Sequence, residues 1–171
     1  IRYNKSLGGG ILNDAGCYPI NASRMLFESE PNGVFCKLIM DKDTQVDTKA
    51  VLLMDFNSNI QAQCSVGYDL DYQSNYRLWG SNGSLNLTRS YNIPPDMSAK
   101  LNVKNSDVEE EIMIEPVNHF KLMIESFCEE IMKSNSYNYN FEEDLLNQAR
   151  VMEACRISNN EKRYVEIKEI K

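Results

Sequence analysis

The stretch IQAQCSVGY, residues 60–68, decides the fold class, because apolar and polar side chains alternate along it without a break. The apolar set consists of Ile60, Ala62, Cys64, Val66 and Tyr68. A period of two is typical of a β-strand that has one face on a core and the other face in water. The stretch therefore predicts an antiparallel sheet with one dry face and one wet face.

Further strands are predicted on both sides of this stretch. Apolar runs or alternating patterns bounded by turn residues cover 34–40, 50–56, 76–79, 84–88, 101–103 and 108–114. The dipeptide Asn82-Gly83 between two of them is a strong hairpin signal. Residues 164–167 are expected to add a last strand.

Helices are expected before and after the strands. Residues 10–28, 117–131 and 142–158 have apolar side chains at spacings of three and four. Pro19 lacks an N–H, so the first helix should be kinked or begin irregularly. Helix, strands, then helices predict an α+β fold: an open, mainly antiparallel β-sheet with helices packed on one face. We expect residues 1–171 to form a single domain.

Composition excludes several classes of protein. The net charge is −7 and the basic residues are scattered, which argues against a nucleic-acid partner. No apolar run approaches the roughly 20 residues of a membrane helix. The five cysteines are irregularly spaced, which favours free thiols and a cytoplasmic location. No metal site is predicted, because His119 is the only histidine and has no partner at ligand spacing.

Candidate chemistry lies in residues 8–24, where three glycines precede the first helix. Asp14 and Tyr18 are four residues apart, so a carboxylate and a phenol should share one helical face. Such a pair suits proton transfer. The same residues also allow a structural interpretation, in which Asp14 caps or pairs locally and Tyr18 packs on the sheet. The glycines do not match a dinucleotide-binding fingerprint and could be a flexible connection.

The pattern G-G-G-x-x-x-D-x-G-x-Y-x-x-N-x-x-R over residues 8–24 resembles the C-terminal domain of the Gfo/Idh/MocA oxidoreductase family. Leu78-Trp79-Gly80-Ser81-Asn82-Gly83-Ser84-Leu85 resembles the family hairpin, and segments 115–131 and 152–158 resemble its later helices. The resemblance therefore spans nearly the whole chain. It implies an N-terminal Rossmann domain, so we expect the chain to be a fragment of a longer protein.

The resemblance implies hydride transfer between NAD or NADP and a sugar or polyol. It assigns proton transfer to Tyr18 and a catalytic role to Asp14, while Asn21 and Arg24 would bind or support the substrate. Gly9 and Gly10 would pass close to the cofactor. Without its N-terminal domain, the fragment is expected to be inactive.

The expected partners are the sugar or polyol, the protein's own N-terminal domain, and further copies of the chain. Homo-oligomers would form through the sheet face that helices leave uncovered. Two alternatives stay open: a non-catalytic binding or scaffold protein with the same fold, and a free-standing sugar-binding module.

Overall fold

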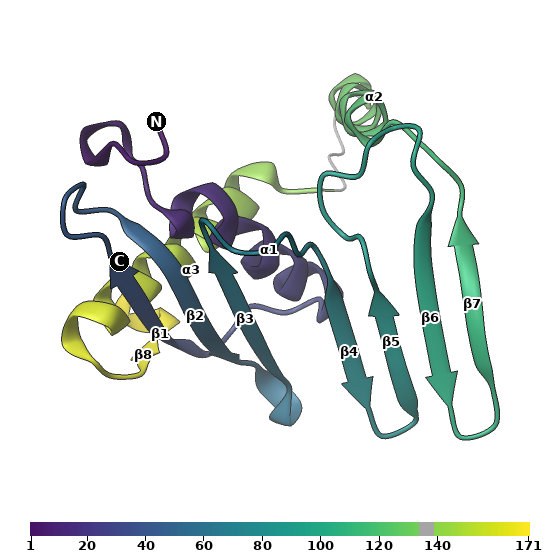
Figure 1. Cartoon of the computed structure of the whole chain (residues 1–171), viewed down its shortest axis with the longest axis horizontal. Helices are drawn as coiled ribbons and strands as arrows, with labels where there is room; N and C mark the ends of the chain where they lie inside the picture. Colours follow the sequence, from purple (N-terminus) through teal and green to yellow (C-terminus); the bar gives the residue numbers. More distant parts are fainter. Residues whose placement is uncertain (134–138) are drawn as a thin grey trace. The chain divides into compact units, whose positions relative to one another are not determined.

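The computed structural model describes residues 1–133 and 139–171, which fall into two compact units. Unit 1 comprises residues 1–70 and 140–171, and unit 2 comprises residues 71–139. Each unit contains one four-stranded sheet, with the orders β3-β2-β1-β8 and β4-β5-β6-β7 (Figure 1). The strand pairings among the described residues are antiparallel. The α+β class and the antiparallel strands are confirmed.

Unit 1 begins with a 3₁₀ turn, η1, and a π-helical turn, η2, that runs directly into the first α-helix. Its strands and helices are η1 (Lys5–Leu7), η2 (Leu12–Gly16), α1 (Cys17–Leu26), β1 (Gly33–Met40), β2 (Asp47–Asp55), η3 (Asn57–Asn59), β3 (Gln61–Gly67), α3 (Phe141–Glu161), β8 (Val165–Glu166) and η4 (Ile167–Glu169). The irregular start expected from Pro19 is therefore present, as a π-helical turn.

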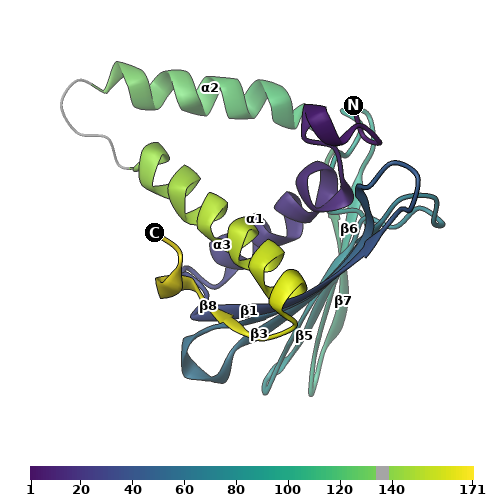
Figure 2. The same ribbon diagram turned by 90° about the vertical axis from the view of Figure 1, so that its left-hand side faces the viewer.

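The two helices of unit 1 cover the same face of its sheet, as Figure 2 shows. Alternate strand residues point toward them, which is why the sequence alternates. The core gathers Val34, Cys36, Leu38, Ala50, Leu52, Met54, Ala62, Ile20, Val151, Ala154 and Cys155. Each large apolar side chain removed from water in this way contributes about 1.5–3 kcal/mol.

The free edge of β1 is covered by helix side chains. Strand β8 pairs only with Gly33 and Val34. Beyond them, the Cys36 N–H donates to Ser158 Oγ and the Leu38 N–H donates to Asn159 Oδ1, both at 2.8 Å. Helix α3 therefore satisfies backbone donors that an additional strand would otherwise bind.

Unit 2 contains β4 (Tyr76–Gly80), β5 (Gly83–Leu87), β6 (Ala99–Asn105), β7 (Glu109–Ile114) and α2 (His119–Met132). The predicted hairpin joins β4 to β5 at Asn82-Gly83. One face of the sheet is polar and has ion pairs from Lys100 to Glu111, at 2.9 Å, and from Lys104 to Glu109, at 3.2 Å.

The single sheet expected from the sequence is divided into two. Residues 68–75 lie between β3 and β4 and belong to no strand of either sheet. This segment contains Asp69, Asp71, Gln73 and Asn75, and aspartate and asparagine are depleted in strands. The polar composition of the connection therefore interrupts the run of strands.

Candidate functional site

Four of the predicted site residues lie on η2 and α1, namely Asp14, Tyr18, Asn21 and Arg24, and Gly9 and Gly10 come just before η2. Asp14 is in the π-helical turn, and Tyr18 is the second residue of the α-helix that continues it. Turns of this kind occur frequently at functional sites. The π-helical turn ends at Gly16, three residues before Pro19. Pro19 lacks an N–H, so one regular helical hydrogen bond is missing at that point.

Positions 9 and 10 require glycine because other segments of the chain lie very close to the backbone there. Gly10 has a φ of +118°, and a Cβ atom there would lie 2.1 Å from Asp47 Oδ1. A Cβ atom on Gly9 would lie 2.5 Å from the carbonyl oxygen of Arg2. The second oxygen of Asp47 accepts the Leu12 N–H at 2.7 Å. The side of each glycine where a Cβ atom would stand is therefore filled by the chain itself.

Asp14 reaches solvent and is paired with a cation. Its Oδ2 atom lies 3.0 Å from Arg2 Nε, and its side chain is 35% exposed. Its backbone N–H donates to the Gly10 carbonyl at 3.0 Å, which anchors the turn. The local pairing considered for Asp14 therefore exists, but it leaves the carboxylate accessible.

Tyr18 and Asn21 lie on the exposed side of the helix. Tyr18 is 55% exposed, so its ring does not pack beneath the sheet. Residues 14, 18 and 21 are spaced by four and three, whereas Ile20 and Ala22 are buried on the other side. The structure thus places a carboxylate, a phenol and an amide along one accessible stretch of η2 and α1.

Arg24 lies on the buried side instead. Its Nε and Nη2 atoms donate to the two carboxylate oxygens of Glu30, at 2.7 and 2.8 Å. Nη2 also donates to Asp144 Oδ1 at 2.8 Å, and Nη1 donates to Gln148 Oε1 at 2.9 Å. The hydrogen bond to Glu30 is the main cause that raises the pKa of Arg24. With 5% exposure, this guanidinium joins α1 to α3, a supporting position.

Three residues near Asp14 have no signal in the local sequence pattern: Arg2, Asp47 and Tyr68. Tyr68 was expected only as an apolar member of an alternating face, and it is indeed 8% exposed. Burial, followed by the charge of Asp14, raises the pKa of Tyr68 to about 12. These residues meet through contacts between distant segments, which a pattern within one segment does not reveal.

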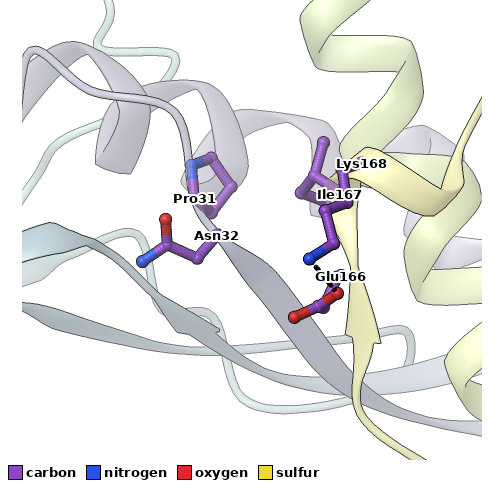
Figure 3. A pocket seen from close by; sticks show the side chains of 5 residues that line it. All are labelled: Pro31, Asn32, Glu166, Ile167 and Lys168. Atoms are coloured by element: carbon purple, nitrogen blue, oxygen red, sulfur yellow. Dashed lines mark ion pairs between the residues drawn. The ribbon is translucent and has the colours of Figure 1, made fainter.

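A hollow of about 360 Å³ lies at the other end of α1 (Figure 3). It is lined by Pro31, Asn32, Glu166, Ile167 and Lys168, and Lys168 Nζ pairs with Glu166 Oε2 at 2.8 Å. None of the predicted site residues lines it. Within the described part of the chain, no three His, Cys, Asp or Glu side chains gather as a metal site, and no helix is long and apolar enough to span a bilayer.

Similar proteins of known structure share this fold. The KijD10 3-ketoreductase from Actinomadura kijaniata, solved with NADP and TDP-benzene, is 27% identical with a TM-score of 0.84, covering 92% of this chain and 48% of its own. Aldose-aldose oxidoreductase from Caulobacter crescentus, solved with glycerol, is 25% identical with a TM-score of 0.84, covering 96% of this chain and 50% of its own.

A curated relative agrees with these structures. The dTDP-3,4-didehydro-2,6-dideoxy-alpha-D-glucose 3-reductase of Actinomadura kijaniata is 28% identical over 91% of this chain and 47% of its own length. The chain thus spans about half the length of the proteins it matches. Residues 1–86, just over half of the 171, match the GFO/IDH/MocA C-terminal domain. The resemblance carried by residues 8–24 is therefore confirmed, and the chain belongs to the GFO/IDH/MocA family through its C-terminal domain.

Proposed function

We propose that this chain is the substrate-binding and oligomerisation domain of an NAD(P)-dependent oxidoreductase acting on a sugar or polyol. The observation that carries the proposal is the exposed series of Asp14, Tyr18 and Asn21 on η2 and α1. All three side chains can hydrogen-bond to a hydroxyl group, and the carboxylate and the phenolate can also act as bases toward it. The relatives that share the fold include a sugar ketoreductase and an aldose oxidoreductase.

In the proposed reaction, an alcohol carbon of the substrate loses its hydrogen with the bonding electron pair, and its hydroxyl loses a proton. The carbon–oxygen bond becomes a carbonyl. Tyr18 takes the proton as the phenolate in this direction, and as the phenol it returns the proton in the reverse reduction. Asp14, held by Arg2, accepts a hydrogen bond from the reacting hydroxyl. Asn21 can donate to or accept from a neighbouring hydroxyl.

The cofactor, NAD or NADP, is proposed to bind mainly to an N-terminal domain. Gly9 and Gly10 are packed against the N-terminal segment and Asp47, which supports this division of roles. The nicotinamide, when bound, supplies the acceptor or donor of the hydride. This chain supplies the groups that bind the hydroxyl and move its proton.

A second copy of the chain is the proposed partner of the uncovered sheet face of unit 1. Phe35 and Leu53 are paired across β1 and β2, and they are 43% and 40% exposed. Val51, on the same face, is 57% exposed. The sequence pattern of residues 60–68 had suggested this use. Gln61, Gln63 and Ser65 supply the polar β3 side of the face. A cytoplasmic location is also proposed, since all five cysteines are free thiols.

The decisive experiment is Tyr18→Phe in the full-length protein. Hydride transfer would be measured with D-xylose, D-glucose and myo-inositol plus NAD⁺ or NADP⁺, and with a TDP-linked 3-keto sugar plus NADPH. We expect kcat to fall by about 10²–10⁴, the usual contribution of a proton-transfer group. Melting temperature should not change, because the side chain lies at the surface.

Tyr164→Phe is the matched control, because it removes another exposed phenol that lies away from Asp14. Tyr164 is 41% exposed and lies beside Gly33. It should leave turnover within a few-fold of the parent. Undiminished turnover in Tyr18→Phe would reject Tyr18 as the proton carrier. No turnover by the parent protein with any of these substrates would favour the non-catalytic scaffold.

A further inference from the structure

Tyr68 carries a polar group that the packing of unit 1 does not explain. The residue is 8% exposed, and its buried hydroxyl has no hydrogen-bond partner among residues 1–133 and 139–171. Buried polar groups are nearly always hydrogen-bonded, so an orphan hydroxyl requires an explanation. Phenylalanine would fill the same space without leaving a donor unpaired.

The carboxylate of Asp14 is the acceptor beside this hydroxyl. Arg2 links the two residues, because its Nε lies 3.0 Å from Asp14 Oδ2 and its guanidinium carbon lies 6.0 Å from the centre of the Tyr68 ring. Asp47 also lies close enough to act on the phenol, and its Oδ2 accepts the Leu12 N–H at 2.7 Å. Of the two carboxylates, Asp14 acts more strongly on the Tyr68 hydroxyl, through its charge and through hydrogen bonding.

The phenol of Tyr68 is suited to donating rather than accepting a proton. Burial and the neighbouring carboxylate raise its pKa to about 12, so it keeps its proton at neutral pH. The ring is fixed by contact with Tyr3, with 5.1 Å between ring centres, and its backbone N–H donates to the Thr48 carbonyl at 2.9 Å. Arg2, by contrast, is 68% exposed on a flexible stem.

We propose that Tyr68 is a positioning residue of the active site, whose hydroxyl donates to the Asp14 carboxylate and fixes it toward the substrate hydroxyl. The proposal rests on the proposed oxidoreductase function, in which Asp14 binds the reacting hydroxyl. It adds a residue from the end of β3 to a site otherwise built on η2 and α1. The buried hydroxyl of Tyr68 and the exposed guanidinium of Arg2 would then hold the same carboxylate.

The test is Tyr68→Phe in the full-length protein, assayed with the substrate and cofactor that the parent turns over fastest. We expect kcat to fall about 10-fold or more, the scale of a hydrogen bond to a charged group. NADP⁺ binding should be unchanged. Melting temperature should fall only slightly, because Asp14 keeps its ion pair with Arg2 and its contact with water. A purely structural role predicts instead a clearly lower melting temperature with normal kcat.

Two further variants make the outcome specific. Tyr3→Phe removes the neighbouring phenol, which donates to Asp69 Oδ2 at 2.7 Å, and it should leave kcat within a few-fold. In an Asp14→Asn background, Tyr68→Phe should have little additional effect, because the two residues act as one unit. If Tyr68→Phe lowers kcat by the same factor in the Asp14→Asn background as in the parent protein, the proposed role of Tyr68 is wrong.

The same set of variants separates this inference from the function on which it rests. If Asp14→Asn and Tyr18→Phe both retain full turnover, the proposed function itself is wrong. If they lose turnover while Tyr68→Phe retains it, the function stands and only the role of Tyr68 is rejected.

Discussion

The two ends of the helical segment 12–26 are built differently, although one sequence motif spans both. At the first end, a π-helical turn leaves Asp14 and Tyr18 accessible. At the other end, a regular helix buries Arg24 among acidic and amide partners from elsewhere in unit 1. The comparison teaches that a single motif can present accessible polar side chains at one end and attach the helix to the fold at the other.

The largest loss of stability is expected for a substitution at Gly10, next to the accessible end of the helical segment. Gly10→Ala puts a side chain at a φ of +118° and against Asp47, which is itself held by the Leu12 N–H. We expect the free energy of unfolding to fall by about 3 kcal/mol, the upper range for backbone strain of this kind. Urea denaturation measures it.

Gly16→Ala is the matched control, because Gly16 has a helical φ of −64° and only the end of the Leu12 side chain lies close, at 3.0 Å. Its stability should stay within about 1 kcal/mol of the parent. Equal stability of both alanine variants would contradict the account of Gly10 as a site of close approach.

Substitution of Arg24 tests the attachment end. Arg24→Leu removes the donors shared by Glu30, Asp144 and Gln148. Because the two carboxylates are 44% and 33% exposed and can regain water, we expect a loss of about 2 kcal/mol rather than that of a fully buried pair. Thermal or urea denaturation gives the value, and kcat per folded molecule should hardly change.

Arg24→Lys sharpens the same point. Lysine keeps the charge but loses the planar fork that contacts both oxygens of Glu30, so part of the stability should be lost. A large fall in kcat with normal stability in either variant would return Arg24 to the substrate-binding role predicted from the sequence motif.

The smallest effect on stability is expected for a substitution in the C-terminal segment of unit 1. The Ile167 N–H donates to the Asn32 carbonyl just before β1, and Glu169 pairs with Arg163 at 2.7 Å. Hydrogen bonding to Arg163 lowers the pKa of Glu169 to about 2, from 4.5. Its stabilising effect is therefore complete above pH 4.5 and lost as the pH falls toward 2.

Glu169→Gln should accordingly lower the melting temperature slightly at neutral pH, and the difference should vanish near pH 2. A constant difference over the whole pH range would show that the ionised carboxylate is not responsible.

Much of the fold was predictable because burial imposes a period on each segment. The alternation of residues 60–68 places β3 with Ala62 facing the helices, and Asn82-Gly83 marks the hairpin. The division into two sheets was not predicted. It depends on residues 68–75 forming no strand, and the composition of that connection could be interpreted only once the strand pairings were known.

The candidate site was predictable only where its residues belong to one helical segment. Asp14, Tyr18 and Asn21 are near neighbours in sequence, so their shared accessible side follows from helical geometry. Asp47 and Tyr68 reach the site from other strands, and their roles depend on hydrogen bonds and burial that only the folded chain creates. Arg24 is the opposite case: it belongs to the same motif, but its position in the motif does not indicate that its side chain is buried.

The covered edge of β1 has a consequence for how the parent protein can be handled. Ser158 and Asn159 already engage the backbone donors of Cys36 and Leu38, so this margin of the sheet cannot template another chain there. Producing this domain on its own should therefore not lead to aggregation by strand addition along that edge.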